Sequence, residues 1–400
     1  MKNITIVGGG TAGWLCALFI QKFITNQSIT LIESDKIGIL GAGEGSTPGF
    51  PFFLKQVNID EKEFIRETSS TIKLGIDFIN WSGDESCYNH DFFTKEYSFH
   101  FDAKKVAAYF KKIALKRGLV YIVDDVVDVK LDTDNNINEL ILQSSKNIET
   151  DFVIDCSGFK RLILGKVYKP NWISYEKHLI VNTAIPFFLP REDTNLNTRT
   201  EAITMKYGWL WKAPIQGRWG CGYVFNRNMI SEENAAEEIQ EYLGHTFDSP
   251  KTFRFNAGCY EEVWVKNCLA VGLSSGFLEP MEATSLMTVL VQLRLLLKHF
   301  PNKDIEKYNK HIKSVNDQNM LFVYYHYMCD RNDTEFWKFY NDSKNIPKDL
   351  FKLYDENLNF KFNNNSVEYE KQFLDSEPVY TTRSWHLVRG GNKRKTGNFI

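Results

Sequence analysis

The feature that most constrains the fold is the segment at residues 4–33. A short β-branched run at residues 4–7 leads into a turn with three glycines, and an apolar run at 15–24 follows. A second apolar run at 29–32 then ends at Glu33. This order of strand, glycine-rich turn, helix and strand is that of a dinucleotide-binding unit. It predicts an α/β fold built on a parallel sheet.

Each of the three glycines has a separate task in such a unit. Gly8 permits a tight turn, Gly10 lets the backbone approach a pyrophosphate, and Gly13 lets the helix pack on the sheet. The helix N-terminus presents unpaired N–H groups to the phosphates. Glu33 follows Gly13 by about twenty residues, the distance at which an acidic side chain holds a ribose hydroxyl. We therefore predict a bound dinucleotide, against the alternative of a glycine-rich turn that binds nothing.

Composition and charge exclude several classes of partner. The chain has 400 residues and a formal net charge of −2, which gives no general attraction for nucleic acid or an anionic membrane. Its longest apolar runs are shorter than the ~20 residues that a membrane span needs. The seven cysteines are scattered singly, which argues against zinc and against disulfides. We expect a cytoplasmic enzyme that acts on a small molecule and holds no metal.

Residues 71–81 alternate in polarity with a period of two, which predicts a half-buried strand. The aliphatic stripe Ile72, Leu74 and Ile76 falls on one face, and Lys73 falls on the other. The default interpretation of such a lysine is a solvated surface. The alternative is a lysine that faces a closed aromatic cavity, where desolvation lowers the pKa of the amine and makes it a donor or a nucleophile.

The remaining segments alternate between helical and strand patterns. We expect helices at 50–57, 60–68, 101–117, 231–243 and 284–300, and strands at 119–129, 137–142, 152–157, 181–188, 200–214 and 219–225. The last three strands are rich in aromatic residues and predict an antiparallel sheet. A glycine-bearing loop precedes the helix at 284–300, so its N-terminus is a ready anion site. From residue 301 onward the chain is polar and mostly helical.

Five motifs resemble those of the flavin-dependent tryptophan halogenases. In chain order they are GGGTAGW at 8–14, GEGSTP at 43–48, DCSGF at 155–159, GWLWKAP at 208–214 and GFLEPMEAT at 276–284. The fourth is close to the W-x-W-x-I-P motif of that family. Together the matches span residues 4–285, and a chance match of five ordered motifs is improbable.

The resemblance implies a fold like that of the flavin monooxygenases, with a doubly wound FAD-binding module at residues 1–300. This module would include a substrate-side antiparallel sheet at about 166–255, and residues 301–400 would form a mostly helical part that covers the substrate. The implied activity is that of a halogenase, which uses reduced FAD, O2 and a halide ion (chloride, bromide or iodide) to make hypohalous acid. The acid would move through an internal tunnel to an electron-rich aromatic substrate.

The resemblance also implies roles for residues at the matching positions. Lys73 would present the halogen to an aromatic carbon, either as an ammonium bonded to hypohalous acid or as a haloamine. Glu282 would orient the oxidant and stabilise the cationic ring intermediate. Its alternative role is that of an acid interacting with a helix dipole. Backbone N–H groups of Thr284 and Ser285 would hold the halide.

The resemblance further implies two sets of contact residues. The implied cofactor contacts are Gly8, Gly10, Thr11, Ala12, Gly13, Glu33, Gly43, Glu44, Val127, Leu273 and Leu286. The implied substrate and tunnel residues are His100, Trp209, Trp211 and Pro214.

Trp209 and Trp211 are one residue apart, so they lie on the same face of a strand. By the resemblance they would keep the substrate away from the flavin, and the alternative is ordinary packing in an aromatic sheet. The segment at 37–45 resembles the strap between the flavin and substrate sites.

Several positions depart from the family pattern. Ala213 replaces the isoleucine of W-x-W-x-I-P, Ala283 stands where serine is common, and Ser285 stands where glycine is usual, which could alter the halide pocket. The C-terminal third matches weakly apart from residues 384–385. We therefore do not carry free tryptophan over as the substrate, and we expect a more open site for varied electron-rich arenes.

The implied partners are a small aromatic substrate and a separate NAD(P)H-dependent flavin reductase, and a homo-oligomer is left open. The alternative activity is that of a monooxygenase or oxidase of the same fold that transfers no halogen. A flavin carrier is a third interpretation, but it would have no need for both Lys73 and Glu282.

Overall fold

The computed structural model describes residues 2–38, 41, 44–93, 95–249, 251–300, 304–350, 380 and 382–391. The helices are α1 Thr11–Phe23, α2 Gly49–Gln56, α3 Glu61–Thr68, α4 Ala103–Lys116, α5 Glu232–Leu243, α6 Thr284–His299, α7 Ile305–Tyr327, α8 Glu335–Asn341 and α11 Thr382–Gly391, with short helical turns η1 Gly158–Lys160, η2 Leu164–Tyr168, η3 Gly272–Ser274, η4 Met281–Ala283 and η5 Ser343–Asn345. The strands are β1 Asn3–Val7, β2 Ser28–Glu33, β3 Glu44–Gly45, β4 Thr71–Ile79, β5 Cys87–Asp91, β6 Ser98–Phe101, β7 Val120–Val123, β8 Val126–Leu131, β9 Ile137–Leu142, β10 Asn147–Glu149, β11 Phe152–Asp155, β12 Trp172–Ser174, β13 Thr183–Pro190, β14 Asn197–Met205, β15 Gly208–Ile215, β16 Arg218–Phe225, β17 Phe253–Arg254, β18 Gly258–Tyr260, β19 Trp264–Val265, β20 Cys268–Ala270 and β21 Gly276–Phe277.

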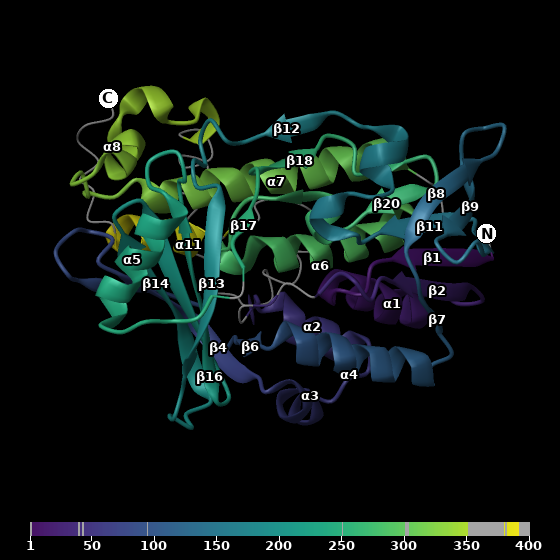
Figure 1. Cartoon of the computed structure of the whole chain (residues 1–400), viewed down its shortest axis with the longest axis horizontal. Coiled ribbons are helices and arrows are strands. Elements are labelled where there is room, and N and C mark those ends of the chain that lie inside the picture. The colour runs from purple at the N-terminus through teal and green to yellow at the C-terminus, as the bar shows by residue number, and fades with distance from the viewer. Residues whose placement is uncertain are drawn as a thin grey trace.

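The N-terminal end of the molecule is built on a six-stranded sheet in the order β19-β20-β11-β1-β2-β7 (Figure 1). All neighbours are parallel except the edge pair β19 and β20. Its central strands are buried nearly throughout, as expected for a parallel sheet with both faces covered. The α/β class and the predicted strand, turn, helix and strand order of residues 4–33 are therefore confirmed.

The other end of the molecule is organised around a nine-stranded sheet. Eight strands follow the order β17-β13-β16-β15-β14-β4-β6-β3, and β5 pairs with β4. Most neighbours are antiparallel, and the exception is β14 with β4, which run parallel. The predicted antiparallel aromatic sheet is confirmed. The expectation of one strand at 200–214 is wrong, because Met205 and Gly208 pair at a hairpin between β14 and β15.

Two long helices join the two ends. Figure 1 shows α6 and α7 running side by side across the molecule, with α8 and α11 beyond them near the nine-stranded sheet. The inner faces of β4, β15 and β16 share one hydrophobic core with α7 and α8, in which Phe78, Trp81 and Trp337 are fully buried. Among the described residues, no helix has the length and apolar character of a membrane span. The division into modules at 1–300 and 301–400 stays a prediction.

Three predicted boundaries need correction. The helix expected at 101–117 begins at Ala103, because the Asp102 side chain accepts hydrogen bonds from the N–H groups of Lys104 and Lys105 and caps it. Phe101 belongs to β6 instead. The run at 119–129 is divided between β7 and β8. The strand expected at 152–157 ends at Asp155, whose carboxylate accepts from the backbone of the loop that follows.

Candidate functional site

The glycine-rich turn after β1 has the shape of a phosphate cradle. Gly8 has a φ of +119°, and a Cβ there would lie 2.3 Å from the carbonyl oxygen of Cys156. A Cβ at Gly13 would lie 1.9 Å from the Gly8 oxygen, so α1 can pack here only because residue 13 is glycine. At Gly10 a Cβ would meet nothing within 4 Å, and α1 has no side-chain cap at this end. Open space in front of uncapped N–H groups fits the pyrophosphate of a dinucleotide.

Glu33 ends β2 beside this turn. A Cβ on Gly9 would lie 2.2 Å from the Glu33 carboxyl carbon, and the Tyr121 hydroxyl donates to Glu33 Oε2 at 2.7 Å. The carboxylate is thus held against the turn, where it fits a ribose hydroxyl.

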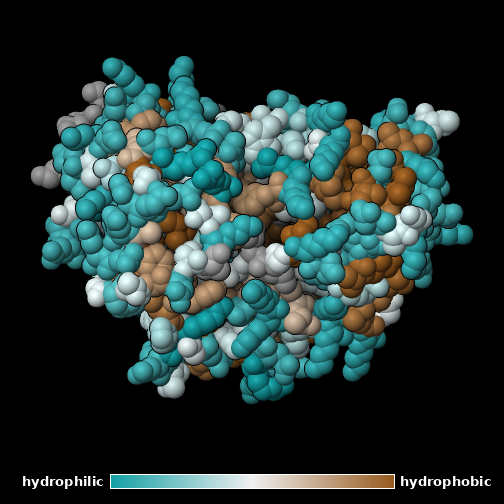
Figure 2. All heavy atoms as spheres, in the orientation of Figure 1, coloured by the Kyte–Doolittle hydropathy of each residue, from teal (hydrophilic) through white to brown (hydrophobic). Residues whose placement is uncertain are grey.

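Val127 on β8 is 52% exposed. Figure 2 shows hydrophobic side chains gathered at this end of the molecule, over the region of β7, β8 and β9.

Lys73 lies in the interior, on β4 between β14 and β6. The residue is only 3% exposed, so the default interpretation of a solvated lysine is wrong. Its Nζ lies 5.7 Å from the centroid of the Phe92 ring. A Cβ on Gly45 would approach this Nζ to 3.0 Å, so glycine at 45 lets the loop backbone lie against the amine. Burial lowers the pKa of Lys73 to about 8, against an opposing effect of the Glu282 carboxylate.

His100 lies beside Lys73 on β6. It is fully buried, its Nε2 lies 2.7 Å from the Thr200 hydroxyl, and its Nδ1 contacts the hydroxyls of Thr71 and Thr198 at 3.2 Å each. Burial first, and the neighbouring Lys73 charge second, hold the pKa of His100 well below its usual range. A neutral imidazole is therefore fixed next to the lysine.

Glu282 occupies a strained turn immediately before α6. Its φ is 59°, and that of Ala283 is 54°, so two residues with side chains adopt left-handed backbone in succession. The Glu282 carboxylate is turned inward, where its Oε1 lies 2.7 Å from Nδ1 of His90 and 2.9 Å from Nε2 of His326. Glu282 therefore pairs with two imidazoles directly before the first turn of α6, and both its catalytic role and its alternative role as an acid interacting with the helix dipole stay predictions.

The charge of Glu282 follows from those contacts. Burial alone would raise the pKa of the carboxyl, but His90 and His326 outweigh it and hold the pKa well below the usual 4.5. The sequence interpretation missed both histidines. Each is a lone histidine in an ordinary pattern, and the contacts join residues 192 and 44 positions apart, so no local signal could reveal them.

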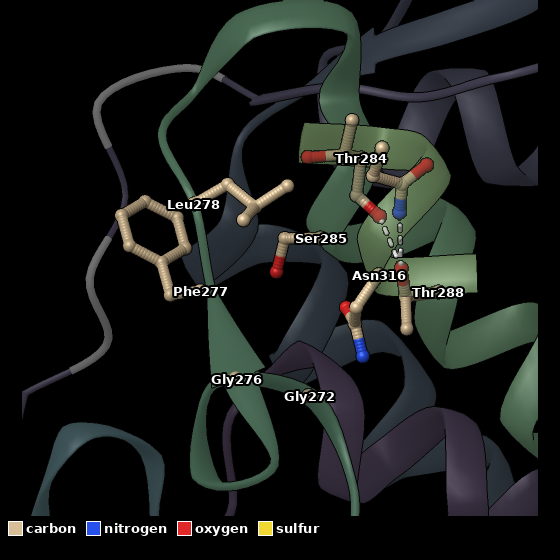
Figure 3. Close-up of a pocket in the computed structure, with 9 residues that line it drawn as sticks. Gly272, Gly276, Phe277, Leu278, Thr284, Ser285, Thr288 and Asn316 are labelled. Atoms are coloured by element: carbon tan, nitrogen blue, oxygen red, sulfur yellow. Dashed lines mark hydrogen bonds between the residues drawn. The ribbon is translucent and has the colours of Figure 1, made fainter. Parts of the chain in front are cut away.

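A first cavity lies between the glycine-bearing turn and the start of α6 (Figure 3). Figure 3 shows Ser285 between the Phe277–Leu278 segment and the side chains of Thr288 and Asn316. Thr288 donates to the Thr284 carbonyl at 2.8 Å, which fixes the first turn of α6. The predicted helix start at residue 284 is confirmed, and both predicted halide residues line this cavity.

A second cavity has Glu282 in its wall, and the space between its lining atoms, including the part open to solvent, is about 530 Å³. His90, Phe92, Glu282 and Met287 line its wall, together with Tyr380 and Arg383 from the C-terminal part. Phe92, which lies under the Lys73 amine, borders the same space as Glu282. Lys73 itself does not line this cavity and is connected to it through Phe92. The lining is mixed in polarity, because Asp91, Glu96 and Arg383 also border the space.

Trp209 and Trp211 lie on one face of β15, as predicted, with ring centroids 6.2 Å apart. Trp209 donates its indole N–H to Glu279 Oε1 at 3.0 Å, and the Tyr327 hydroxyl donates to the same oxygen at 2.8 Å. Burial raises the pKa of Glu279 to about 7. The sequence interpretation quoted Glu279 within a motif and gave it no role.

Several other predicted site residues line neither of the two cavities. The Pro214 carbonyl accepts from the Thr71 hydroxyl in the sheet, and neither Pro214 nor the two tryptophans line either cavity above. Glu44 lies on β3, and burial together with Asp102 raises the pKa of its carboxyl to about 7. Gly43 lies outside the described residues. The contacts expected for Val127, Leu273 and Leu286 stay predictions.

Comparison with known proteins gives a consistent result. A family model described as tryptophan halogenase matches residues 3–96 and 93–398. The chain is 26% identical over 473 residues to tryptophan 6-halogenase ThaL of Streptomyces albogriseolus, which covers 98% of this chain and 89% of that protein. It is 29% identical over 415 residues to tryptophan 7-halogenase RebH of Lentzea aerocolonigenes, with 84% and 78% covered.

Solved structures resemble the whole chain. Tryptophan 6-halogenase SttH of Streptomyces toxytricini superposes with a TM-score of 0.88 at 25% identity, covering 98% of this chain and 90% of that one. BrvH, a flavin-dependent halogenase of Brevundimonas sp. BAL3, gives a TM-score of 0.86 at 25% identity with the same coverage.

Proposed function

Because the chain belongs to the tryptophan halogenase family, we propose that it is a flavin-dependent halogenase acting on an electron-rich aromatic ring. The observation that carries the proposal is the buried Lys73 amine, which lies over Phe92, a residue that lines the same cavity as Glu282. A desolvated amine beside the cavity and a carboxylate in its wall suit electrophilic substitution, in which a cation forms and a proton leaves.

FAD fits the cradle formed by Gly8, Gly10 and Gly13, with Glu33 for the ribose. Reduced FAD, with O2, would supply the oxidising equivalent that converts halide to hypohalous acid. The chain's own part is to hold the halide at the backbone N–H groups of Thr284 and Ser285. The lining of the first cavity by these two residues supports this role. A separate flavin reductase would deliver the reduced cofactor.

Lys73 would receive the hypohalous acid at the second cavity. With a pKa of about 8, the side chain has both a protonated and a neutral form near neutral pH, so a hydrogen-bonded acid and a haloamine are both open. In the hydrogen-bonded case, the arene carbon forms the carbon–halogen bond and the oxygen–halogen bond breaks. The departing hydroxide takes a proton from the Lys73 ammonium and leaves as water. The ring carbon then loses its proton to Glu282.

Mass spectrometry of products from a panel of arenes tests the proposal. The assay contains the protein, FAD, a flavin reductase, NADH and chloride, bromide or iodide in turn, and we expect a product with one halogen in place of hydrogen. Strict preference for free tryptophan would overturn the expected open site. Hydroxylated products without halogen would favour the monooxygenase alternative.

Two variants localise the chemistry. Lys73→Met should abolish the halogenated product while oxidation of reduced FAD continues. Lys105→Met is the matched control, because Lys105 is exposed on α4 and donates to the Ser69 hydroxyl. If Lys73→Met still gives wild-type yields of halogenated arene, Lys73 does not deliver the halogen.

A further inference from the structure

Three buried side chains form a hydrogen-bonded chain that ends at the first turn of α6. The Tyr380 hydroxyl donates to Asn319 Oδ1 at 3.0 Å, and Asn319 Nδ2 donates to the Thr288 hydroxyl oxygen at 3.1 Å. The Thr288 hydroxyl donates in turn to the Thr284 carbonyl oxygen at 2.8 Å. Figure 3 shows the last two of these bonds meeting at Thr288. Because all three residues are buried, bulk water does not compete for the bonds.

The last bond fixes the direction of the whole chain. A carbonyl oxygen only accepts hydrogen bonds, so the single hydroxyl proton of Thr288 lies on the bond to Thr284. The Asn319 atom that faces Thr288 must therefore be the donor Nδ2, which leaves Oδ1 toward Tyr380. The Tyr380 hydroxyl then has to donate. None of these groups changes charge near neutral pH, so the direction depends on no protonation state.

The two ends of the chain lie at different cavities. Thr288 and Asn319 line the first cavity, beside the start of α6. Tyr380 lines the second cavity, where its ring is stacked on Phe322 with centroids 3.8 Å apart and an interplanar angle of 21°. The chain therefore leads from the wall of one cavity to the wall of the other.

The carbonyl at the end of the chain belongs to the same peptide group as the Ser285 N–H. A donor bonded to the oxygen of a peptide group polarises it and makes its N–H a better donor, and successive bonds reinforce one another. The Ser285 N–H lies in the first turn of α6, where N–H groups have no acceptor within the helix. Among the residues that the structure describes, no side chain caps this helix end. An anion in the first cavity would supply the acceptor.

We propose that Tyr380, Asn319 and Thr288 are positioning residues that link the two cavities, so that an arene in the second cavity and a halide in the first each strengthen the binding of the other. This inference rests on the proposed function, which places the halide at the Ser285 N–H and the arene in the second cavity. The arene packs against the Tyr380 ring and holds its hydroxyl on Asn319. The halide draws on the same chain from its other end, so each ligand lowers the Kd of the other by the same factor.

The alternative is that the chain only satisfies buried polar groups between α6 and α7. Halide and arene would then bind independently. Loss of the Tyr380 hydroxyl would change the stability of the protein and leave the ratio of the two halide Kd values, with and without arene, at one.

Titration of FAD-loaded protein with iodide, in the absence of any reductant, measures this ratio without turnover. Saturable quenching of the flavin fluorescence gives the iodide Kd, first without an arene and then with a saturating amount of the tightest-binding arene of the panel. We expect the arene to lower the iodide Kd about fivefold, the factor that corresponds to one buried hydrogen bond. Equal Kd values with and without the arene overturn the proposal, and so does the lack of saturable iodide binding.

Replacement of Tyr380 tests whether the effect passes through the chain. Tyr380→Phe keeps the ring on Phe322 and removes only the hydroxyl, so the arene should change the iodide Kd by less than about twofold. Tyr308→Phe is the matched control, because the Tyr308 hydroxyl is also buried and donates to another carbonyl of α6, that of Gln292, at 3.0 Å. It should keep the wild-type ratio. A wild-type ratio in Tyr380→Phe, or its loss in Tyr308→Phe, overturns the proposal.

Replacement of Thr288 tests the other end of the chain. Thr288→Val has nearly the same shape but no hydroxyl, so the Thr284 carbonyl loses its side-chain donor. The arene effect should disappear, and iodide should bind about threefold more weakly even without arene. Thr288→Ser keeps the hydroxyl and should restore both values. Equal iodide binding by Thr288→Val and the wild type, with and without arene, overturns the proposal.

These titrations separate the inference from the proposed function. If iodide and arene strengthen each other's binding but no arene is halogenated, the link between the cavities stands and the proposed activity fails. If halogenated arene is formed but the two ligands bind independently, the activity stands and the inference fails.

Discussion

Replacement of Lys73 by methionine should stabilise the protein while removing its activity. Methionine has nearly the length of lysine and fills the same space without a charge. The pKa of the buried Lys73 amine falls from 10.5 to about 8, and each pH unit of this difference corresponds to about 1.4 kcal/mol. The ammonium therefore costs about 3 kcal/mol of folding free energy at pH 7. The Nζ lies 5.7 Å from the Phe92 centroid, near the outer limit for such a contact, so its loss offsets about 1 kcal/mol of the gain.

The pH dependence distinguishes this cause from a change in packing. Below pH 8 both the folded and the unfolded chain carry the Lys73 proton, so the full penalty is present. Between pH 8 and 10.5 the folded chain releases the proton first, and wild-type stability rises as this penalty is lost. At pH 10 less than about 1 kcal/mol of the penalty remains. The advantage of Lys73→Met should shrink accordingly.

Guanidinium denaturation of both proteins at pH 7 and pH 10 measures these quantities. We expect Lys73→Met to be about 2–3 kcal/mol more stable than the wild type at pH 7 and nearly equal to it at pH 10. Lys105→Met, at an exposed position, should change stability by less than about 0.5 kcal/mol at either pH. A destabilised Lys73→Met, or a gain in stability that is the same at both pH values, would show that the buried ammonium carries no such penalty.

Three further predictions concern other parts of the site. Gly8→Ala should lower the denaturant midpoint sharply, because its Cβ would lie 2.3 Å from the Cys156 carbonyl oxygen. Gly10→Ala should unfold like the wild type, since its Cβ meets nothing within 4 Å, but it should weaken FAD binding at least about tenfold in a fluorescence titration. Equal effects of the two on folding would contradict the cradle. Burial raises the pKa of Glu279 to about 7, so ionisation of this carboxyl lowers the free energy of unfolding of the wild type by about 3 kcal/mol between pH 4.5 and 7.5. In denaturation experiments Glu279→Gln should lose about 3 kcal/mol less stability than the wild type over this pH range. A variant with the full wild-type slope would rule Glu279 out as its source. Ala283→Gly should raise the free energy of unfolding by about 1 kcal/mol, since glycine adopts a φ of 54° without strain, and a lower value would show that the turn is unstrained.

The sequence predicts the nucleotide cradle well because its determinants are local. Gly8, Gly13 and Glu33 belong to one strand, turn, helix and strand unit, and within it Gly13 meets the Gly8 backbone. The atom that a Cβ at Gly8 would meet first, the Cys156 carbonyl oxygen, comes from the loop after β11 and lies outside that unit. The start of α6 at Thr284 is equally local.

The burial of Lys73 could not be predicted from the pattern of β4. A period of two assigns Lys73 and Ile72 to opposite faces, but it does not say which face another layer will cover. Lys73 is buried because β14 and β6, which are distant from β4 in the sequence, flank this strand and because the loop backbone at Gly45 lies against the amine. The pairing of Glu282 with His90 and His326 is hidden for the same reason, since it exists only once β5, η4 and α7 are packed together.

We propose that the oxidant passes inside the protein to Lys73, and a scavenger experiment can show whether it does. Protein loaded with reduced FAD is mixed with O2, bromide and an electron-rich arene that carries no halogen. The reaction is run with and without an excess of free methionine, which destroys hypobromous acid in solution. Methionine should leave the yield of brominated arene unchanged for the wild type, because the oxidant never enters bulk solvent. A yield that falls in proportion to the methionine added would mean that the oxidant leaves the protein before it reaches the arene.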